Sequence, residues 1–581
     1  MSDLKKITRP HGAIRGLAYV ARSSSEDTRF GRMFRWLPGE TYDKAALGRL
    51  SLIMIQQESA KAKFPGDGVA DGPSTTFNTP PPLLDTKFRE AEAGDENPSI
   101  PAGYTYFGQF IDHDLTFDPN SSLQKLNDPD ATENFRTPRL DLDSLYGRGP
   151  DDQPYLFDDD AQSIKFIVPK QRPGELQRNI NGRAIIGDPR NDENHIVAQL
   201  QALFLNFHNK VIDQLGKNRT DLDNQPHAKF ELAQRIVRWH YQYLVINDYL
   251  PKILGTQTLT AVLGDKPATD PKPQLSFYKP KGGKAYIPVE FSVAAFRFGH
   301  SMVRPSYALN QHIGGSGPTA TFSEGRFNRV PIFDGTVTAG ASLDGFQPLP
   351  QNWEIDWNLF FSADGKMPVS VFQKAGDVDN NKWQVDFAHH ANFNTQPGYR
   401  IDTQLVDPLA MLPINVAKSG DQPDNIPSLA FRNLLRGSQF QLPSGQNVAR
   451  ALGLPVLTEA ELWTDSEGEL NKDLQGAFAF NAPLWYYILK ESEIKTTGPA
   501  GGPGLPKTAD AAGGHHLGAV GGRIVGEVLV GVLWNDHTSY LYQDSRWTPA
   551  SEKAKSGFDP GTQLNSIHAM ISWVTGGKMS L

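Results

Sequence analysis

Cysteine is absent from this sequence of 581 residues. Its absence excludes disulfide bonds, thiolate zinc sites, iron–sulfur clusters and a cysteine nucleophile. It leaves the redox compartment unreadable, although a chain without thiols tolerates a strong oxidant better than most. A chain of this length can bury a large apolar core, so stability requires neither a metal nor a disulfide.

The sequence also has neither a large excess of charge of one sign nor a long apolar run. The formal net charge is -8, with acidic and basic residues interspersed, which argues against nucleic acid or an anionic membrane surface as a partner. Nowhere do 18 apolar residues follow one another, and the opening MSDLKKITRPHGAIRG lacks the apolar core of a signal peptide. We therefore expect a soluble protein without a membrane span. The sequence favours neither secretion nor a cytoplasmic location.

Glycine and proline are abundant, at 53 and 43 residues, against about 12% for the two together in an average protein. This excess predicts much irregular chain between short elements, and residues 120–163 and 496–514 are expected to be long loops. The fold is expected to be mainly α with few short strands, the strands falling within 274–287 and 369–387. Apolar residues at helical spacing predict helices over 44–62, 104–115, 193–216, 230–250, 289–305 and 521–534. For the third of these, Asn191 or Asp192 is the expected cap and Gly216 the expected end.

Residues 108–119, GQFIDHDLTFDP, place two carboxylates on either side of a histidine in an apolar run. On a helix, Gln109 and His113 share one face, whereas Asp112 and Asp114 point about 200° apart. One arrangement turns Gln109, Asp112 and His113 towards one pocket and sends Asp114 to a separate site. A buried carboxylate needs a partner, and a hard cation with oxygen ligands is the best candidate.

The segment TPRLDLDS offers the rest of such a cation site. Thr137, Asp141 and Asp143 stand at even spacing with the carbonyl of Arg139 between them, which makes an oxygen-rich loop suited to calcium. An exposed, solvated acidic loop is the alternative interpretation of the same residues.

The motif Gln109-x-x-Asp112-His113-Asp114 resembles the distal histidine segment of the animal-type haem peroxidases. This family belongs to the peroxidase–cyclooxygenase superfamily, which includes myeloperoxidase and lactoperoxidase. The resemblance implies that Gln109 borders a halide site and that His113 faces the haem iron. It also implies that Asp112 forms an ester to a haem methyl group and that Asp114 binds calcium.

Further blocks resemble the same family in order and in internal spacing. TPRLDLDS is similar to its calcium loop, and GDPRNDE to the segment that carries the catalytic arginine and the second ester-forming carboxylate. AAFRFGHSMVRP resembles the proximal histidine segment, and NLLRGSQFQLP the segment whose asparagine bonds that histidine. The residues implied are Thr137, Arg139, Asp141 and Asp143 for calcium; Arg190 for catalysis; Glu193 for the ester; His300 for the iron; Asn433 as the acceptor from His300; and Arg297 and Arg436 for the haem propionates.

The resemblance implies one large helical haem peroxidase domain over residues 41–581, preceded by an N-terminal extension over 1–40. The implied cofactors are haem b, ester-linked through Asp112 and Glu193, and calcium. The implied activity is the use of hydrogen peroxide to oxidise iodide, bromide, thiocyanate or small phenols. A weaker likeness of GGRIVGEVL to bacterial members, with no obvious propeptide, predicts a bacterial protein.

Two positions decide between family members. Asn194 stands where some mammalian peroxidases have a methionine that forms a sulfonium link, so we expect no chloride oxidation at neutral pH. Arg297 stands three residues before His300, where the fatty-acid dioxygenases of the superfamily carry a radical-forming tyrosine. The alternatives are such a dioxygenase, or a calcium-ordered binding protein that is not an enzyme. The sequence predicts no oligomeric state. His515 and His516 are expected to be loop residues.

Overall fold

The computed structural model describes most of the chain between residue 30 and the C-terminus. Part of the predicted helix over 44–62, parts of the expected loops over 120–163 and 496–514, and most of 369–387 lie outside the described residues. The described residues are 30–55, 96–118, 127, 132, 134–159, 162, 164–267, 269–310, 330–333, 342–362, 373–374, 383–384, 395–410, 412, 426, 428–464, 470–494 and 513–581.

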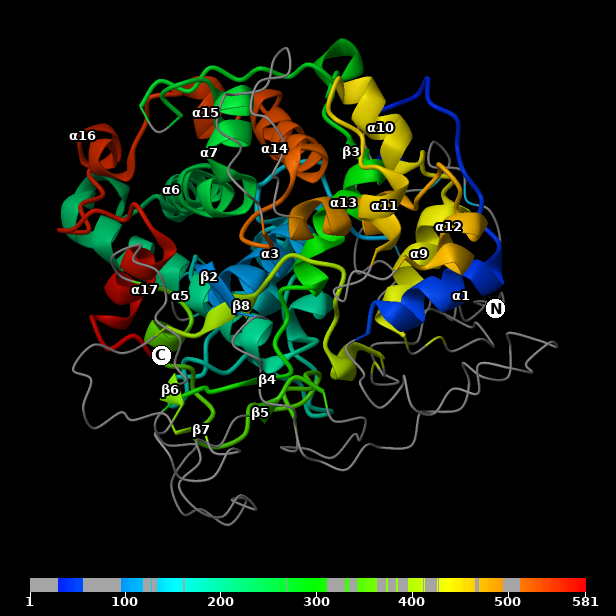
Figure 1. Ribbon diagram of the computed structural model, residues 1–581. Helices are drawn as coiled ribbons and strands as arrows, with labels where there is room; N and C mark the ends of the chain where they lie inside the picture. Colours follow the sequence, from blue (N-terminus) through cyan, green and yellow to red (C-terminus); the bar gives the residue numbers. More distant parts are fainter. Residues whose placement is uncertain are drawn as a thin grey trace, which may run out of the picture.

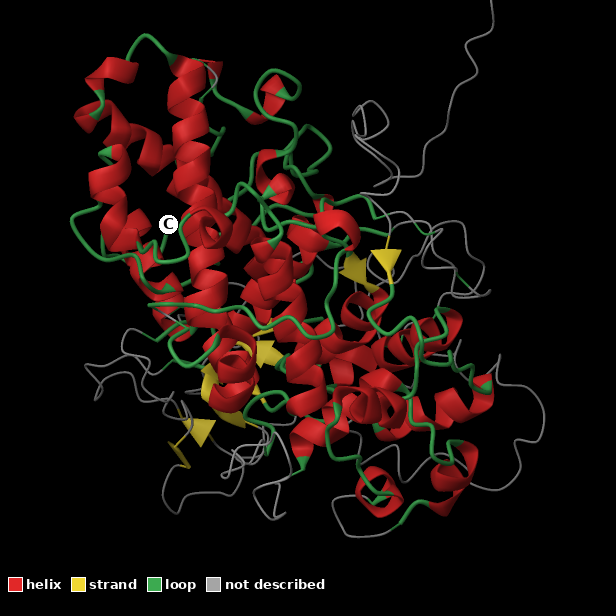
Figure 2. Cartoon of the chain, turned by 90° about the horizontal axis from the view of Figure 1, so that it is seen from above, coloured by secondary structure: helices red, strands yellow, loops and turns green. Residues whose placement is uncertain are grey.

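Helices dominate the described part of the chain, which confirms the expected fold class (Figure 2). The longer helices are α1 (Lys44–Ile53), α3 (Gly103–Leu115), α5 (His195–Asn218), α6 (Pro226–Leu244), α7 (Leu250–Leu263), α9 (Leu429–Gln439), α10 (Gly445–Leu452), α13 (Leu484–Glu493), α14 (Ala519–Trp534) and α17 (Ile567–Thr575). The shorter ones are α4 (Asp143–Tyr146), α11 (Glu459–Trp463), α12 (Lys472–Ala477), α15 (Tyr540–Gln543) and α16 (Glu552–Ser556).

Tighter and wider helical turns connect the α-helices. The 3-10 turns are η2 (Pro154–Leu156), η4 (Pro189–Asp192), η5 (Thr220–Leu222), η7 (Lys281–Gly283), η9 (Ala295–His300), η10 (Trp357–Leu359), η11 (Asp407–Ala410) and η12 (Pro549–Ser551). The π-turns are η6 (Val245–Tyr249) and η8 (Glu290–Ala294). The turns η8 and η9 replace the α-helix expected over 289–305, which was therefore the wrong type, because Ala294 has φ -128° and ψ -72° and breaks the helical path.

The strands pair only two at a time. β1 (Phe30–Gly31) runs parallel to β3 (Ile287–Pro288), and the other three pairs are antiparallel. These are β2 (Glu96–Pro101) with β8 (Pro397–Tyr399), β4 (Ser306–Tyr307) with β5 (Val330–Pro331), and β6 (Gln373–Lys374) with β7 (Trp383–Gln384). Strands were expected at 274–287 and 369–387; the first stretch forms one only at its end, and in the second the four described residues, 373–374 and 383–384, form β6 and β7.

Helix α3 lies in the middle of the molecule (Figure 1) and carries Gln109, Asp112, His113 and Asp114. It packs against α5, and it also contacts η4 and η9, the turns that carry the other functional segments. Phe107 and Phe110 of α3 stack on Phe204 of α5 at centroid distances of 6.5 and 4.8 Å. Such aromatic packing fixes the rotation of α3 about its axis, and therefore which pocket each polar side chain enters.

Helix α5 begins later than expected. Asn194 caps it by accepting from the backbone N–H groups of Ile196 and Val197 at 3.1 and 2.9 Å, so the prediction of Asn191 or Asp192 as the cap was wrong. Asn191 and Asp192 instead belong to η4, which the proline at its first position favours. The helix continues past Gly216 to Asn218. All the apolar positions used to predict it are buried: Val197, Leu200, Phe204, Phe207, Val211 and Leu215.

The segment from residue 30 to 40, part of the predicted N-terminal extension, packs on the main body. The buried carboxylate of Glu290 accepts from the backbone N–H groups of Met33 and Phe34 at 2.9 and 3.1 Å. Buried N–H groups without an acceptor are costly, so this side chain holds the segment in place. The predicted domain boundary at residue 40 stays a prediction.

Replacing Glu290 with alanine tests this contact. Because the substitution leaves two buried N–H groups without an acceptor, we expect the free energy of unfolding in urea to fall by about 2–4 kcal/mol. Glu231→Ala, at an exposed position of α6, is the control and should change it by less than about 0.5 kcal/mol. Equal effects of the two substitutions would contradict the role given to Glu290.

Candidate active site

One turn of α3 sends its polar side chains into different surroundings, as the helical spacing predicts. Asp112 lines an internal cavity, His113 lies beside η4, and Asp114 meets a group of carboxylates on another side of the helix. Asp112 accepts from the hydroxyl of Thr116, one turn later, at 3.1 Å. The separation expected between Asp112 and Asp114 is therefore present in the structure.

Two amides fix the orientation and the tautomer of His113. Its Nδ1 lies 2.7 Å from the side-chain oxygen of Asn191, and the Nδ2 of Asn191 donates to the Oε1 of Gln201 at 2.8 Å. Because an amide oxygen can only accept, His113 Nδ1 carries the proton. The lone pair of the neutral ring therefore resides on Nε2, which is 3.6 Å from a carboxylate oxygen of Glu193.

The protonation preferences of His113 and Glu193 suit proton transfer. Burial, and after it the positive charge of Arg190, lower the pKa of His113 to about 3, so the ring is a neutral base at pH 7. Burial raises the pKa of Glu193 to about 7, although Arg190 and the amide of Gln109 oppose this. The Gln109 amide nitrogen donates to Glu193, and its oxygen accepts from Asn194 at 3.2 Å.

A buried carboxylate holds the catalytic arginine expected from the sequence. Asp188 accepts from the Nε and Nη2 of Arg190 at 3.2 and 2.8 Å, and also from Arg136 on its other side. Arg190 Nη2 donates in addition to the carbonyl oxygen of His113 at 2.9 Å. Its guanidinium lies 4.7 Å from the ring centroid of Phe117, so Arg190 has little freedom to move.

The cavity beside these residues brings the distal and proximal segments together. It has a volume of about 180 Å³. Asp112 and Arg190 contribute to its wall from one side, and Arg297 and Arg436 from η9 and α9. The remaining lining residues are Phe30, Thr116, Phe117, Asp118, Val289, Ser292, Val293 and Phe440.

His300 is tied to this cavity through Asn433 and Arg297. The Nδ2 of Asn433 lies 2.8 Å from His300 Nδ1, and its oxygen accepts from Arg297 Nη1 at 2.8 Å. The amide thus presents its N–H to His300, the opposite of the direction expected from the sequence, because Arg297 occupies the amide oxygen. Burial, and then Arg297, lower the pKa of His300 to about 3.

The two arginines that line the cavity, Arg297 and Arg436, have too few carboxylates beside them to balance their positive charges. Burial, followed by repulsion from Arg436, lowers the pKa of Arg297 to about 10. Arg436 pairs with Asp118 at 2.6 Å, yet its Nε is buried without a hydrogen-bond partner among the described residues. An anionic group in the cavity would satisfy both guanidinium groups.

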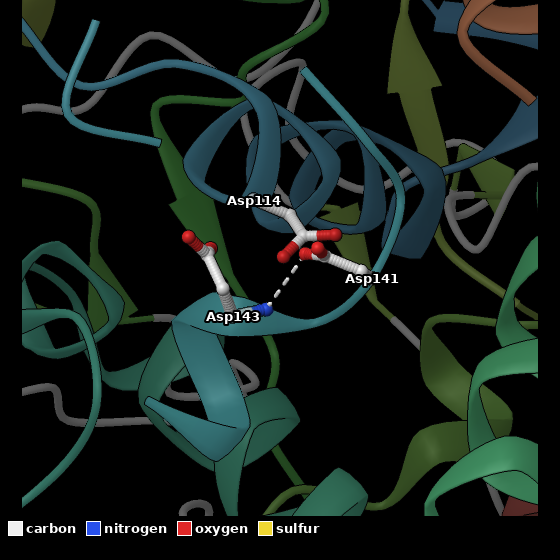
Figure 3. Close-up of side chains that lie close together, drawn as sticks. All are labelled: Asp114, Asp141 and Asp143. Carbon is white, nitrogen blue, oxygen red and sulfur yellow. Dashed lines mark hydrogen bonds between the residues drawn. The ribbon is translucent and has the colours of Figure 1, made fainter. Parts of the chain in front are cut away.

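The expected cation loop places three carboxylates together. Ligand oxygens of Asp114, Asp141 and Asp143 lie within 4.8 Å of one another. Figure 3 shows Asp114 on α3 and Asp141 and Asp143 on the loop leading into α4, with a hydrogen bond of 3.2 Å from the backbone N–H of Asp143 to Asp141. Thr137 Oγ1 donates to Asp141 at 2.9 Å. The part expected of the Arg139 carbonyl stays a prediction.

Burial first, and mutual repulsion after it, raise the pKa of Asp114 well above its ordinary value. Burial raises the pKa of Asp143 to about 7, against the pull of Arg136, whose Nη1 lies 3.3 Å from it. Asp114 is buried and Asp141 and Asp143 are half-buried, and the positive charges of Arg238 and Arg139 also act on Asp141. A divalent cation would neutralise the mutual repulsion of three carboxylates this close together.

The sequence argument missed three residues of the site. Asn191 sets the tautomer of His113, Asp188 fixes Arg190, and Arg136 joins Asp188 to Asp143. A signal for the first two existed, because both stand in GDPRNDE beside Arg190 and Glu193. Arg136 directly precedes the cation loop. No pattern in the sequence shows that it turns inward.

Comparisons with known proteins point to one family. A family model described as "Animal haem peroxidase" matches residues 128–347. A peroxidase-like protein of Margaritifera margaritifera is 32% identical over 127 residues, which are 20% of this chain and 14% of that protein. Thyroid peroxidase of Rattus norvegicus is 29% identical over 133 residues, 23% of this chain and 13% of that protein. The chain thus spans a small part of the length of these relatives.

Solved structures share the fold over most of the chain. Peroxidase A from Dictyostelium discoideum has a TM-score of 0.58 at 15% identity, covering 95% of this chain and 94% of that one. A fatty acid alpha-dioxygenase of Oryza sativa has a TM-score of 0.52 at 14% identity, covering 83% and 76%. At such identities these likenesses show the fold alone. The segment of residues 128–347 thus matches the animal haem peroxidase family, and the chain as a whole shares the fold of these solved structures.

Proposed function

We propose that this protein is a haem peroxidase that uses hydrogen peroxide to oxidise iodide, bromide, thiocyanate and small phenols. The observation that carries the proposal is the neutral His113, whose Nε2 lone pair is left free by the Asn191 contact, beside an immobilised Arg190. A structural role alone would not require a buried imidazole with one nitrogen that makes no hydrogen bond beside a cavity lined by Arg190, Arg297 and Arg436.

Residues in and around the cavity fit haem. Arg297 and Arg436, the latter with an Nε that has no hydrogen-bond partner among the described residues, suit the two propionates, and His300 would ligate the iron. Bound there, haem supplies an iron that exchanges electrons with peroxide and with the donor. Asp112, which lines the cavity, and Glu193, beside His113, are the carboxylates proposed to form esters with it.

His113 moves the proton. Its Nε2 takes a proton from hydrogen peroxide and returns it to the departing oxygen, while the bond from Nδ1 to Asn191 holds the ring in place. Arg190 stabilises the negative charge that develops as the O–O bond breaks, because Asp188 keeps its guanidinium fixed in a site with little water.

Ligation of iron by His300 also sets the state of its partners. If His300 held the iron through Nε2, its ring proton would lie on Nδ1, and Asn433 would need to present its amide oxygen to accept it. Arg297, which contacts that oxygen at 2.8 Å, would then be available to a propionate.

Two residues bear on which electron donor is oxidised and on which reaction is catalysed. Asn194 is used as the cap of α5 and as a donor to Gln109, and its amide cannot form a sulfonium link. We therefore propose that iodide and thiocyanate are oxidised and that chloride is not at neutral pH. Arg297 in place of a tyrosine argues against the dioxygenase chemistry of the rice neighbour, and no described contact favours that alternative.

The haem-loaded protein should react with peroxide through His113. We expect a Soret band that shifts on addition of hydrogen peroxide and returns as added iodide forms triiodide. His113→Gln should slow the peroxide reaction by about 10²–10⁴-fold in stopped-flow absorbance, because the proton acceptor is lost.

His227→Gln, at an exposed position at the start of α6, is the matched control and should react like the unmodified protein. A colourless protein, or one whose haem ignores peroxide, would overturn the peroxidase proposal. Efficient chlorination at pH 7 would overturn only the assignment of donors.

The proposed ester links can be tested by acidified solvent extraction after peroxide turnover. Asp112→Val and Glu193→Gln should each release part of the haem, and the double substitution should release nearly all of it. Asp118→Asn is the control, because Asp118 also lines the cavity yet is not assigned an ester. Complete extraction from the unmodified protein would refute covalent attachment.

We propose calcium as the ion held by Asp114, Asp141 and Asp143. Millimolar calcium should raise the melting temperature by about 3 °C, and EGTA should reverse the change. The pKa of about 7 for Asp143 means that protons compete with calcium below pH 7, so the shift should be larger at pH 8 than at pH 5.5. Asp143→Asn should reduce it, whereas Asp151→Asn, at an exposed position, should leave it unchanged.

A further inference from the structure

A second hollow lies on another part of the surface, formed by β2, α7 and the segment that leads into α14. Its volume is about 390 Å³. Three basic side chains and two hydroxyl groups line it, and none of its lining residues carries a carboxylate. The lining residues are Ser99, Pro251, Lys252, Gly255, Thr256, His515 and His516.

A break in α7 creates the hollow. Gly255 has φ 68° and ψ 161°, a conformation that side chains rarely allow. A Cβ there would also lie 2.8 Å from the ring of His516. The break frees the carbonyl of Ile253, which accepts from the backbone N–H of Leu517 at 2.9 Å. This bond draws the segment of residues 513–517 across the break and places His516 over Gly255.

The histidine segment is fixed by backbone bonds and is not a loose loop. The side-chain amide of Asn97 donates to the carbonyls of Gly514 and His515 at 3.0 and 3.2 Å. Gly514 also accepts from the N–H of Ile401 at 2.8 Å and donates to the carbonyl of Ser492 at 2.7 Å. The expectation that His515 and His516 lie in a loop is confirmed. The loop nevertheless holds both rings at one hollow.

The charge of Lys252 has no direct counterion. Among the described residues, no carboxylate lies within 4 Å of its Nζ, which sits 5.0 Å from the ring centroid of Tyr104. The neighbouring Asp248 is already engaged by the hydroxyl of Tyr104 and the N–H of Ile567, both at 2.8 Å. After the break, the helix starts again at Thr256, and its first N–H groups add positive potential at the hollow.

We propose that this hollow binds a small oxyanion. The charged group of this ligand, its headgroup, is a phosphate or a carboxylate. Lys252 supplies the charge, and Ser99 and Thr256 supply hydroxyl donors, the set that recognises oxyanions elsewhere. A transition metal is disfavoured because a lysine lines the hollow together with the two histidines and none of the lining residues is an acid. The volume leaves room beside Pro251 for a compact organic body attached to the headgroup.

Isothermal titration of the haem-loaded full chain with inorganic phosphate and, separately, with benzoate tests the site. We expect one saturable site for at least one of the two anions, with affinity lowered about tenfold by Lys252→Met and lowered also by His516→Gln. Lys266→Met, at an exposed position beyond the end of α7, is the matched control and should bind like the unmodified protein.

Binding of phosphate alone would identify a phosphate-type ligand, and tighter binding of benzoate an organic carboxylate. Unchanged binding in both Lys252→Met and His516→Gln would place the anion elsewhere on the protein and would overturn the proposal. Failure of both anions to bind saturably would overturn it as well. Melting curves of each variant confirm that the protein titrated is folded.

Discussion

The carboxylate of Asp188 is the contact on which the arrangement of both sites depends. It is fully buried and accepts from Arg136 on one side and Arg190 on the other. Burial alone would raise the pKa of Asp188, but the two guanidinium groups lower it below its ordinary value, so the group is a fixed anion. Arg136 continues to Asp143 and Arg190 to the carbonyl of His113. The cation loop and the proton-transfer site therefore share one charged network.

Close backbone packing makes this network possible. Gly187, just before Asp188, lies against α4, and a Cβ on it would be 2.5 Å from the carbonyl oxygen of Ser144. Since α4 begins at Asp143, this approach sets how far Asp188 lies from the acidic cluster. A cation bound to the three carboxylates would also hold the start of α4, against which Gly187 packs. The cation would therefore help to keep Arg190 in position.

In the part of the site that contains His300, the positive charges of the arginines are not fully balanced by carboxylates. Two buried arginines face one cavity with Asp118 and Asp112 as the nearby carboxylates, and Asn433 links one of them to His300. An anion in the cavity would offset the repulsion between these arginines. The side chains around His113, in contrast, are already paired through the amides of Asn191, Gln201 and Gln109.

The sequence by itself determined the helical class, the positions of most helices and the separation of Asp112 from Asp114, because these follow from side-chain period along one chain. The family resemblance added the roles of Arg190, Glu193 and His300. Only the tertiary structure decided which nitrogen of His113 is free, that Asn194 caps α5, and that the proximal segment forms π and 3-10 turns in place of an α-helix. Those features depend on partners distant in sequence, such as Gln201 for Asn191 and Arg136 for Asp188, and spacing along the chain carries no information about such contacts.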